Sequence, residues 1–252
     1  MHSLTKTETA SMHTQGGEGT HQPIRKADSI LEDMRLDLIT GVLAPGERVK
    51  IQDLTERYKV SQTTIREVLP KLAAEGFVVE IAQRGYQVLP ISLEDLDELT
   101  HIRLDLELPA LIQSIAHGGP EWEVGILRAQ HLMRVYAREY PDTDKVEHTR
   151  GWIAVHREYH ASLIAGSPSI RRRHYCRNLF DQSSRYFWLA ANSLSSSKAN
   201  LEHHAELTDT ILSGNEDLSV KMLRDHIEQA HDDIMCYMVK DTSIKHRMAP
   251  KE

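Results

Sequence analysis

The stretch Ile51–Val78, IQDLTERYKVSQTTIREVLPKLAAEGFV, predicts two short helices joined by a tight turn. Leu54 and Tyr58 lie on one face of the first helix, and the helical register breaks at Val60-Ser61. Ser61 is a favourable N-cap for the second helix. The apolar positions of that second helix are Ile65, Val68, Leu69 and Leu72. The stretch therefore predicts a helix-turn-helix.

The sequence after Gly76 changes to an alternating pattern that is typical of a β-hairpin. It runs FVVEIAQRGYQVLPI over Phe77–Ile91, with Gln83-Arg84-Gly85 at the hairpin tip. A hairpin in this position forms the wing of a winged helix-turn-helix. Such a domain places its second helix in the major groove of DNA.

The exposed start of the second helix carries side chains that suit DNA recognition, namely Gln62, Thr63, Thr64 and Arg66. Arginine pairs with guanine and glutamine with adenine, whereas threonine hydroxyls suit phosphate. Arg84, beside Gly85 at the hairpin tip, is placed to reach the DNA backbone or the minor groove. Taken singly, each of these arginines is more often a solvated surface cation. The helix-turn-helix around them is what favours DNA contact.

An amphipathic helix is expected ahead of this unit, over Ile24–Ile39. It ends at Gly41, and the following LAPGERV, Leu43–Val49, predicts a turn at Pro45-Gly46. Residues 22–90 together are expected to form the DNA-binding domain. Residues 1–21 are polar and are expected to be a disordered tail.

Composition excludes several classes of protein. The chain has 252 residues, 40% hydrophobic and 27% charged, with a net charge of −7. This acidic balance argues against indiscriminate coating of nucleic acid or membrane. No stretch approaches the roughly 18 apolar residues that span a bilayer, and the opening residues lack the apolar core of a signal peptide. Cys176 and Cys236 form no paired motif, so a cytoplasmic location without disulfides is expected.

From Ser92 onward the pattern is almost wholly helical, and Ser92 with Asp95 resembles a capping box. Helices are expected at 92–116, 120–140, 144–165, 168–191, 197–212 and 216–239, the last capped by Asn215. Short connections between them indicate an antiparallel bundle over 91–240, followed by a flexible tail at 241–252. The predicted fold class is mainly α, with an N-terminal winged helix-turn-helix and a C-terminal all-α bundle.

Four histidines lie on faces that should point into this bundle. His156 and His160 share a face with Leu163, whereas His204 and His226 each follow the apolar positions of their own helix. His204 and His226 lie on either side of the break at Ser213-Gly214, each roughly 14–18 Å from it, so they would meet at one depth. A lone histidine on an apolar face is more often a core residue than a ligand. Four at one level are best satisfied by one divalent cation.

Residues 41–88 resemble the DNA-binding domain of the GntR family of bacterial transcription regulators. The shared pattern is Gly41, Pro45-Gly46-Glu47, Leu54, Val60-Ser61, Arg66-Glu67, Leu69, Leu72, Glu75-Gly76 and Gly85. Gln62 departs from the pattern, because the family usually has arginine after Val-Ser. This departure affects the base preference that the resemblance implies.

Residues 92–240 resemble the FCD ligand-binding domain found in one branch of that family. Its motif, Asp-x-x-aromatic-His followed by two further histidines, maps onto Tyr159, His160, His204 and His226, with His156 in the place of the Asp. The resemblance implies a divalent metal whose shell is completed by an effector carboxylate. We expect the effector to contact Arg103 and Tyr159. The alternative for Arg103 is an internal ion pair with Glu107.

Imidazole in place of carboxylate shifts the metal preference towards Zn²⁺, with Ni²⁺, Cu²⁺ or Mn²⁺ as alternatives. The expected partners are a second copy of the chain, double-stranded operator DNA with a short inverted repeat, and a small carboxylate effector. Repression is expected, with activation as the alternative.

Two alternative functions are a metal-free regulator and an enzyme. A regulator of the same fold could sense acyl-CoA or another organic ligand without metal. A histidine-liganded metallohydrolase is disfavoured, because Glu158 is third in HREYH, unlike the glutamate of zinc-protease motifs.

Overall fold

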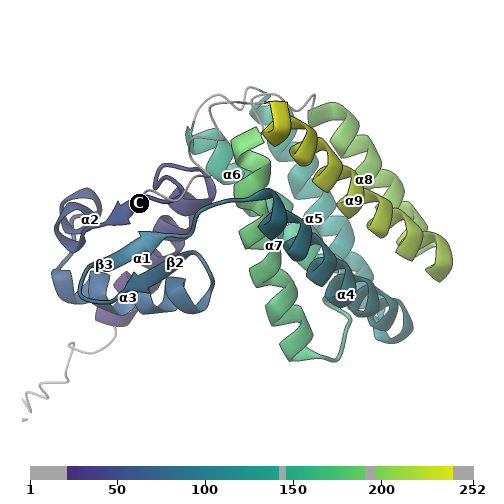
Figure 1. Cartoon of the computed structure of the whole chain (residues 1–252). Helices are drawn as coiled ribbons and strands as arrows, with labels where there is room; N and C mark the ends of the chain where they lie inside the picture. The colour runs from purple at the N-terminus through teal and green to yellow at the C-terminus, as the bar shows by residue number, and fades with distance from the viewer. Residues whose placement is uncertain (1–21, 142–145, 191–196, 241–252) are drawn as a thin grey trace, which may run out of the picture.

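The computed structural model describes residues 22–141, 146–190 and 197–240, and the two predicted tails lie outside these ranges. Within them a small head, residues 22–91, lies beside a larger helical bundle that starts at Ser92 (Figure 1). The elements of the head are α1 (Gln22–Ile39), β1 (Arg48–Val49), α2 (Ile51–Tyr58), α3 (Gln62–Ala74), β2 (Val78–Ile81) and β3 (Gly85–Val88). Those of the bundle are α4 (Leu93–His117), α5 (Pro120–Glu139), α6 (Val146–Leu163), α7 (Ile170–Ala190), α8 (Ser197–Leu212) and α9 (Glu216–Lys240). The predicted fold class is confirmed.

The core of the head lies between α1, α3 and the sheet. Its fully buried side chains include Met34 and Leu38 from α1 and Ile65 and Leu69 from α3. Ser61 caps α3, because its hydroxyl accepts a hydrogen bond from the Thr64 amide at 3.2 Å. The predicted helix-turn-helix is therefore present, with the predicted cap.

The sheet of the head contains a strand that the sequence did not predict. Arg48 and Val49 pair with Gln87 and Tyr86, so that the strand order is β1-β3-β2 with antiparallel neighbours. The segment before α2 was expected to be a turn only. A strand of two residues is too short to show an alternating pattern, and its partner lies nearly forty residues further along the chain.

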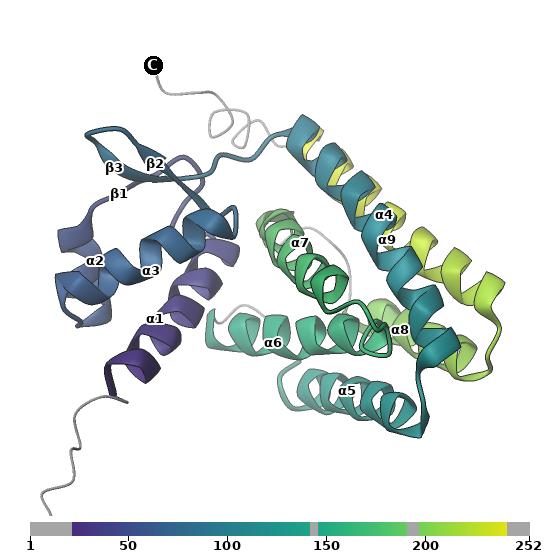
Figure 2. The same cartoon turned by 90° about the horizontal axis from the view of Figure 1, so that it is seen from below.

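In the bundle, α4 packs against α7 and α9, and α5 packs against α6 and α8 (Figure 2). The Ser92 hydroxyl accepts from the Asp95 amide at 3.0 Å, and the Asn215 side chain accepts from the Leu218 amide at 3.1 Å. Both residues therefore cap their helices as predicted, but the capping box at Ser92 is incomplete, because the Ser92 amide donates to the Tyr186 hydroxyl at 3.3 Å. The core between these helices is built from aliphatic side chains together with Trp152 and Tyr159.

Candidate metal centre and DNA-binding surface

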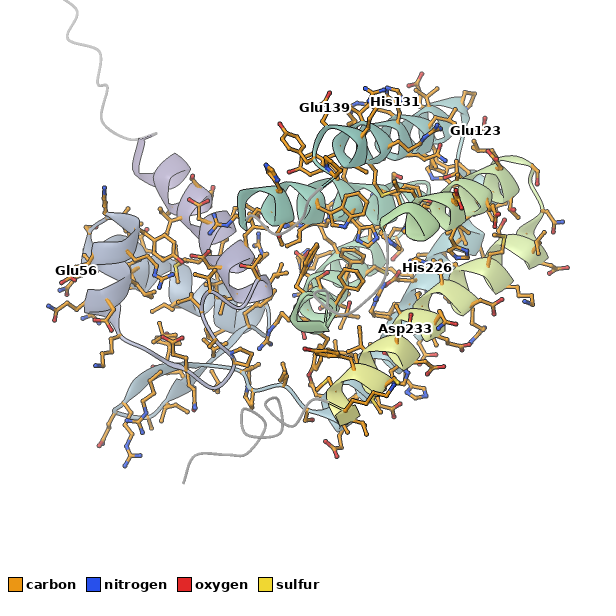
Figure 3. The ribbon with its side chains drawn as sticks, turned by 90° about the horizontal axis from the view of Figure 1, so that it is seen from above. Glu56, Glu123, His131, Glu139, His226 and Asp233 are labelled. Atoms are coloured by element: carbon orange, nitrogen blue, oxygen red, sulfur yellow. The ribbon has the colours of Figure 1, made fainter. Side chains whose placement is uncertain are left out.

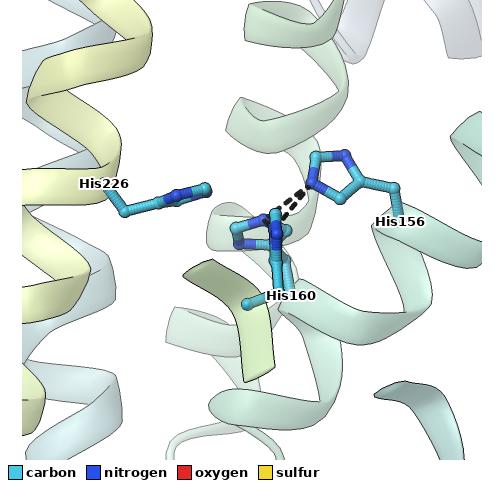
Figure 4. A group of neighbouring side chains, drawn as sticks. His156, His160 and His226 are labelled. Carbon is cyan, nitrogen blue, oxygen red and sulfur yellow. Dashed lines mark hydrogen bonds between the residues drawn. The ribbon is translucent and has the colours of Figure 1, made fainter. Parts of the chain in front are cut away.

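Four imidazoles from three helices meet inside the bundle. His156 and His160 lie on one face of α6 because they are four residues apart, while His204 comes from α8 and His226 from α9. Gly214 (φ +74°) turns the chain between α8 and α9, which lets the last two meet. Figure 3 shows His226 on the side of α9 that faces the other helices, and Figure 4 shows its ring beside those of His156 and His160. One ligand atom from each of the four lies within 4.8 Å of the others.

Three of these rings form a tight triangle of nitrogens. His156 Nε2 lies 3.1 Å from His204 Nε2 and 3.1 Å from His160 Nε2, and the third side is 3.4 Å. A ring nitrogen either carries the proton and donates or lacks it and accepts. Two of three nitrogens must therefore share a role, and the three contacts cannot all be hydrogen bonds.

A metal ion resolves this conflict, because all three nitrogens can then be unprotonated and bind the ion through their lone pairs. Bonds of about 2.0–2.1 Å to a tetrahedral ion put ligand nitrogens about 3.3–3.4 Å apart, and octahedral geometry brings neighbours slightly closer. The observed separations match these values without movement of the helices. The three histidines of the triangle therefore fit a divalent ion, and His226 adds a fourth ligand atom within 4.8 Å of the others.

Burial keeps these imidazoles neutral, as metal ligands must be. Removal from water lowers the pKa of His156, His160 and His226 well below the usual value, and the neighbouring imidazoles and Arg103 lower it further. At neutral pH these rings have a free lone pair, so an ion can bind without first displacing a proton.

The metal-free protein is expected to lose stability as the pH falls from 7.5 to 6. The three histidines stay neutral when folded but bind protons near pH 6.5 when unfolded, so the unfolded state gains protons first. Each contributes at most about 1.4 kcal/mol per pH unit below about pH 6.5. Thermal unfolding in chelator measures the effect, and a midpoint that stays constant or rises over this range would contradict it.

Asp181 limits the pH window of that experiment. Burial raises its pKa to about 6, so its contribution is largest at low pH and is lost as the pH rises through about 6. Below pH 6 it therefore opposes the effect of the histidines. Between pH 7 and 6 the proton uptake of Asp181 offsets only part of the loss, because three histidines act against one carboxyl.

Tyr159 supports the cluster from behind. Its side chain is fully buried, and its hydroxyl donates to the His204 carbonyl oxygen at 2.9 Å and lies 3.1 Å from the Thr208 hydroxyl. Trp152 stacks on His156 with ring centroids 5.8 Å apart. Tyr159 was expected to contact an effector, but the structure places it outside the lining of the cavity described next. Its observed contacts position His204.

A cavity of about 680 Å³, partly open to solvent, adjoins the cluster between α4, α6, α7 and α9. His156, His160 and His226 form part of its wall, as does Arg103. The Arg103 guanidinium also donates to both carboxylate oxygens of Glu107, at 2.7 and 3.4 Å, and to the Ser183 hydroxyl at 2.9 Å. Arg103 thus lines the predicted effector site and also forms the internal ion pair that was its alternative.

The side chains predicted to read DNA lie on the surface of the head. Gln62, Thr63 and Arg66 are exposed along the start of α3, and Thr64 is partly exposed with its hydroxyl 3.0 Å from that of Ser61. Arg84 is exposed in the turn between β2 and β3, and Gly85 follows with φ +85°, a conformation that favours glycine. Figures 1 and 2 both show the hairpin tip and the start of α3 at the end of the head farthest from the bundle.

An ion-pair chain connects α6, which carries His156 and His160, to the head. Arg157 lies next to His156 on α6, and its guanidinium contacts Glu32 of α1 at 2.8 Å and Asp181 of α7 at 2.9 Å. Arg35 of α1 in turn donates to the Glu75 carboxylate, directly after α3, at 2.8 and 2.9 Å. Sequence reasoning missed these contacts. Only the position of Arg157 between two inward-facing histidines could have drawn attention to it.

Two family models match the chain. The model described as bacterial regulatory proteins, gntR family, covers residues 22–88, and the FCD domain model covers residues 98–229. The chain belongs to the GntR family. It is a DNA-binding transcription regulator with an FCD effector-binding domain.

Curated relatives of this GntR-family protein are also transcription regulators. It is 34% identical to the HTH-type transcriptional regulator BphR of Paraburkholderia xenovorans over 82% of this chain and 86% of the relative. It is 29% identical to the HTH-type transcriptional repressor GlaR of Escherichia coli over 77% and 89% of the two chains. The family consists of regulators, not enzymes, which excludes the metallohydrolase alternative.

Solved structures share the fold of this GntR-family chain at low sequence identity. A GntR transcriptional regulator from Rhodococcus sp. RHA1 has a TM-score of 0.67 at 21% identity, covering 84% of this chain and 98% of the other. McbR/YncC of E. coli has a TM-score of 0.68 at 17% identity, covering 83% of this chain and 96% of the other.

None of the helices within the described ranges is long and apolar enough to cross a bilayer.

Proposed function

We propose that this GntR-family protein is a repressor whose operator binding is controlled by a small carboxylate, bound beside a divalent ion in the bundle. The observation that carries the proposal is the cluster of His156, His160, His204 and His226, whose ligand atoms lie within 4.8 Å of one another beside a cavity. Zn²⁺ is the first candidate, with Ni²⁺, Cu²⁺ and Mn²⁺ as alternatives. The ion would supply a Lewis-acidic anchor for one carboxylate oxygen.

The DNA-binding surface proposed here consists of Gln62, Thr63, Thr64, Arg66, Arg84 and Gly85. Its support is the exposure of these residues at the end of the head that lies away from the bundle. A homodimer would present two such surfaces to an inverted repeat, because the symmetry of the operator mirrors that of the protein.

Arg157 offers a route by which effector binding reaches the head. It shares α6 with His156 and His160, and it pairs with Glu32 in α1. An effector that binds the two arrangements of the head unequally would shift the balance between them, since equal binding regulates nothing. The metal-free alternative is disfavoured, because without an ion the triangle of histidine nitrogens cannot be fully satisfied.

The proposal is tested with an operator that the protein itself selects from a pool of random duplexes. Its affinity is measured by fluorescence anisotropy with a panel of small carboxylates, using both metal-loaded and chelator-stripped protein. We expect at least one acid to weaken operator binding about 5- to 150-fold when metal is present, the usual range of allosteric coupling. The same acid should have no effect on stripped protein. Equal operator affinity under every condition would contradict the proposal.

A further inference from the structure

We infer that the effector is an aryl monocarboxylate, a flat apolar acid with a single charged group. The inference rests on the proposed function, because it takes the histidine cluster as the anchor of the carboxylate. It goes further, because the side chains that line the cavity indicate the chemistry of the effector beyond its carboxylate. Those walls are aromatic and aliphatic, and nearly all of their polar groups are already bonded within the protein.

Aromatic side chains enclose the space next to the histidines. Phe180 lies 4.7 Å from His160 and 5.5 Å from His156 between ring centroids, and Phe187 lies 6.5 Å from His156. Trp188 packs edge-on against Phe187 at 5.3 Å. The part of the effector that is bonded to its carboxylate would therefore contact these aromatic side chains first. Aromatic rings favour stacked or edge-to-face contacts with another flat aromatic group.

Aliphatic side chains form a further part of the lining. They are Leu96, Ile153, Ile227, Ala230 and Ile234. The volume of about 680 Å³ includes the opening to solvent. A ring-bearing acid fits the chemistry of these walls.

The polar hydroxyls of the cavity have little left to offer a second acidic group. Thr100 donates to the Leu96 carbonyl oxygen at 2.8 Å, and Ser184 donates to that of Phe180 at the same distance. The Ser183 hydroxyl also donates to the Phe180 carbonyl oxygen, at 3.0 Å. None of these hydroxyl protons is free to bind a carboxylate.

The cationic and imidazole groups beyond the cluster are likewise engaged. Glu107 neutralises Arg103 through two hydrogen bonds, and Ser183 takes a third. His231 Nδ1 lies 3.0 Å from an oxygen of Asp232, and its Nε2, which has no hydrogen-bond partner, lies 3.5 Å from an oxygen of Asp97, so an acidic side chain faces each ring nitrogen. A second carboxylate would have to compete with Glu107 for Arg103 and with Asp97 and Asp232 for His231, which is unfavourable.

Matched acids test the inference on metal-loaded, full-length protein. 4-Methylbenzoate and terephthalate share a ring and differ only in a methyl group against a second carboxylate. Isothermal titration calorimetry is expected to give at least tenfold tighter binding of 4-methylbenzoate. Benzoate is expected to bind more tightly than hexanoate, and succinate more weakly than either. Binding of terephthalate or succinate as tight as that of 4-methylbenzoate, or hexanoate tighter than benzoate, would overturn the inference.

Variants assign the selectivity to individual side chains. Phe187→Ala should weaken benzoate binding by about fivefold or more, because ring contacts are lost, while the metal content stays at the wild-type level. Thr100→Val is the matched control, since its hydroxyl is bonded to the backbone, and should bind benzoate as the wild type does. Glu107→Gln leaves Arg103 without its countercharge and should favour terephthalate relative to 4-methylbenzoate by tenfold or more. An unchanged ratio in Glu107→Gln would contradict the role given to this ion pair.

Metal analysis of the same samples distinguishes failure of the proposed function from failure of this inference alone. Protein that binds no divalent ion contradicts the proposed function. Metal-loaded protein whose operator affinity responds to dicarboxylates, but not to aryl acids, contradicts only this inference.

Discussion

Replacing Arg66 with alanine is expected to weaken operator binding about 5- to 150-fold, the usual value of a bidentate contact to a base. Arg66 is exposed near the start of α3, and Ile65 and Val68 beside it anchor the helix in the core. The substitution removes a surface side chain and should leave the fold unchanged. Anisotropy titration of the self-selected operator measures the loss, and repeated selection with the variant should show relaxed preference at one base position.

Arg128→Ala is the matched control for Arg66. Arg128 is an exposed arginine on α5, outside the head. The Arg128→Ala substitution removes the same charge from the protein, so any general electrostatic effect on DNA binding appears in both variants. Equal operator affinities for Arg66→Ala and Arg128→Ala would mean that α3 is not the recognition helix.

Replacing His160 with alanine is expected to lower the affinity for the divalent ion more than about 100-fold, since even partners behind the ligands account for 10- to 100-fold. His160 Nε2 belongs to the triangle with His156 and His204, so the substitution removes one corner of the site. Equilibrium dialysis with elemental analysis measures the loss. Release of the operator by acid should disappear in the same variant.

Two further variants make the His160 experiment specific. His131→Ala removes an exposed imidazole from α5 (Figure 3) and should bind the ion as the wild type does. His156→Asp restores the carboxylate of the family motif, and it should retain the ion while shifting preference towards Mn²⁺. If His160→Ala keeps a full equivalent of tightly bound ion, His160 is not a ligand.

Local chemistry made most of the fold predictable. Ser61, Ser92 and Asn215 cap their helices as expected, because a cap depends only on the three residues that follow it. The helix predicted from residue 168 begins instead at Ile170. The Ser169 hydroxyl accepts from the Arg172 amide at 3.3 Å and so acts as its cap. Such shifts arise where several serines compete for one cap.

Contacts distant in the sequence were much harder to predict. The pairing of Arg48 and Val49 with β3 depends on where the hairpin folds back, which two residues cannot reveal. The meeting of His204 and His226 was predictable because one turn joins their helices. The contact of Arg157 with Glu32 spans more than a hundred residues and the boundary between head and bundle, so no local pattern indicates it. The aromatic walls of the cavity were missed for the same reason.

We propose that the histidine cluster of this DNA-binding regulator is a metal centre. Anomalous X-ray diffraction shows directly whether an ion is bound there. Crystals of the full chain, purified without chelator and supplied with Zn²⁺, are measured on both sides of the zinc absorption edge. We expect one strong anomalous peak per chain, about 2.0–2.1 Å from the Nε2 atoms of His156, His160 and His204. Absence of a peak among these nitrogens, in crystals that contain zinc, would contradict it.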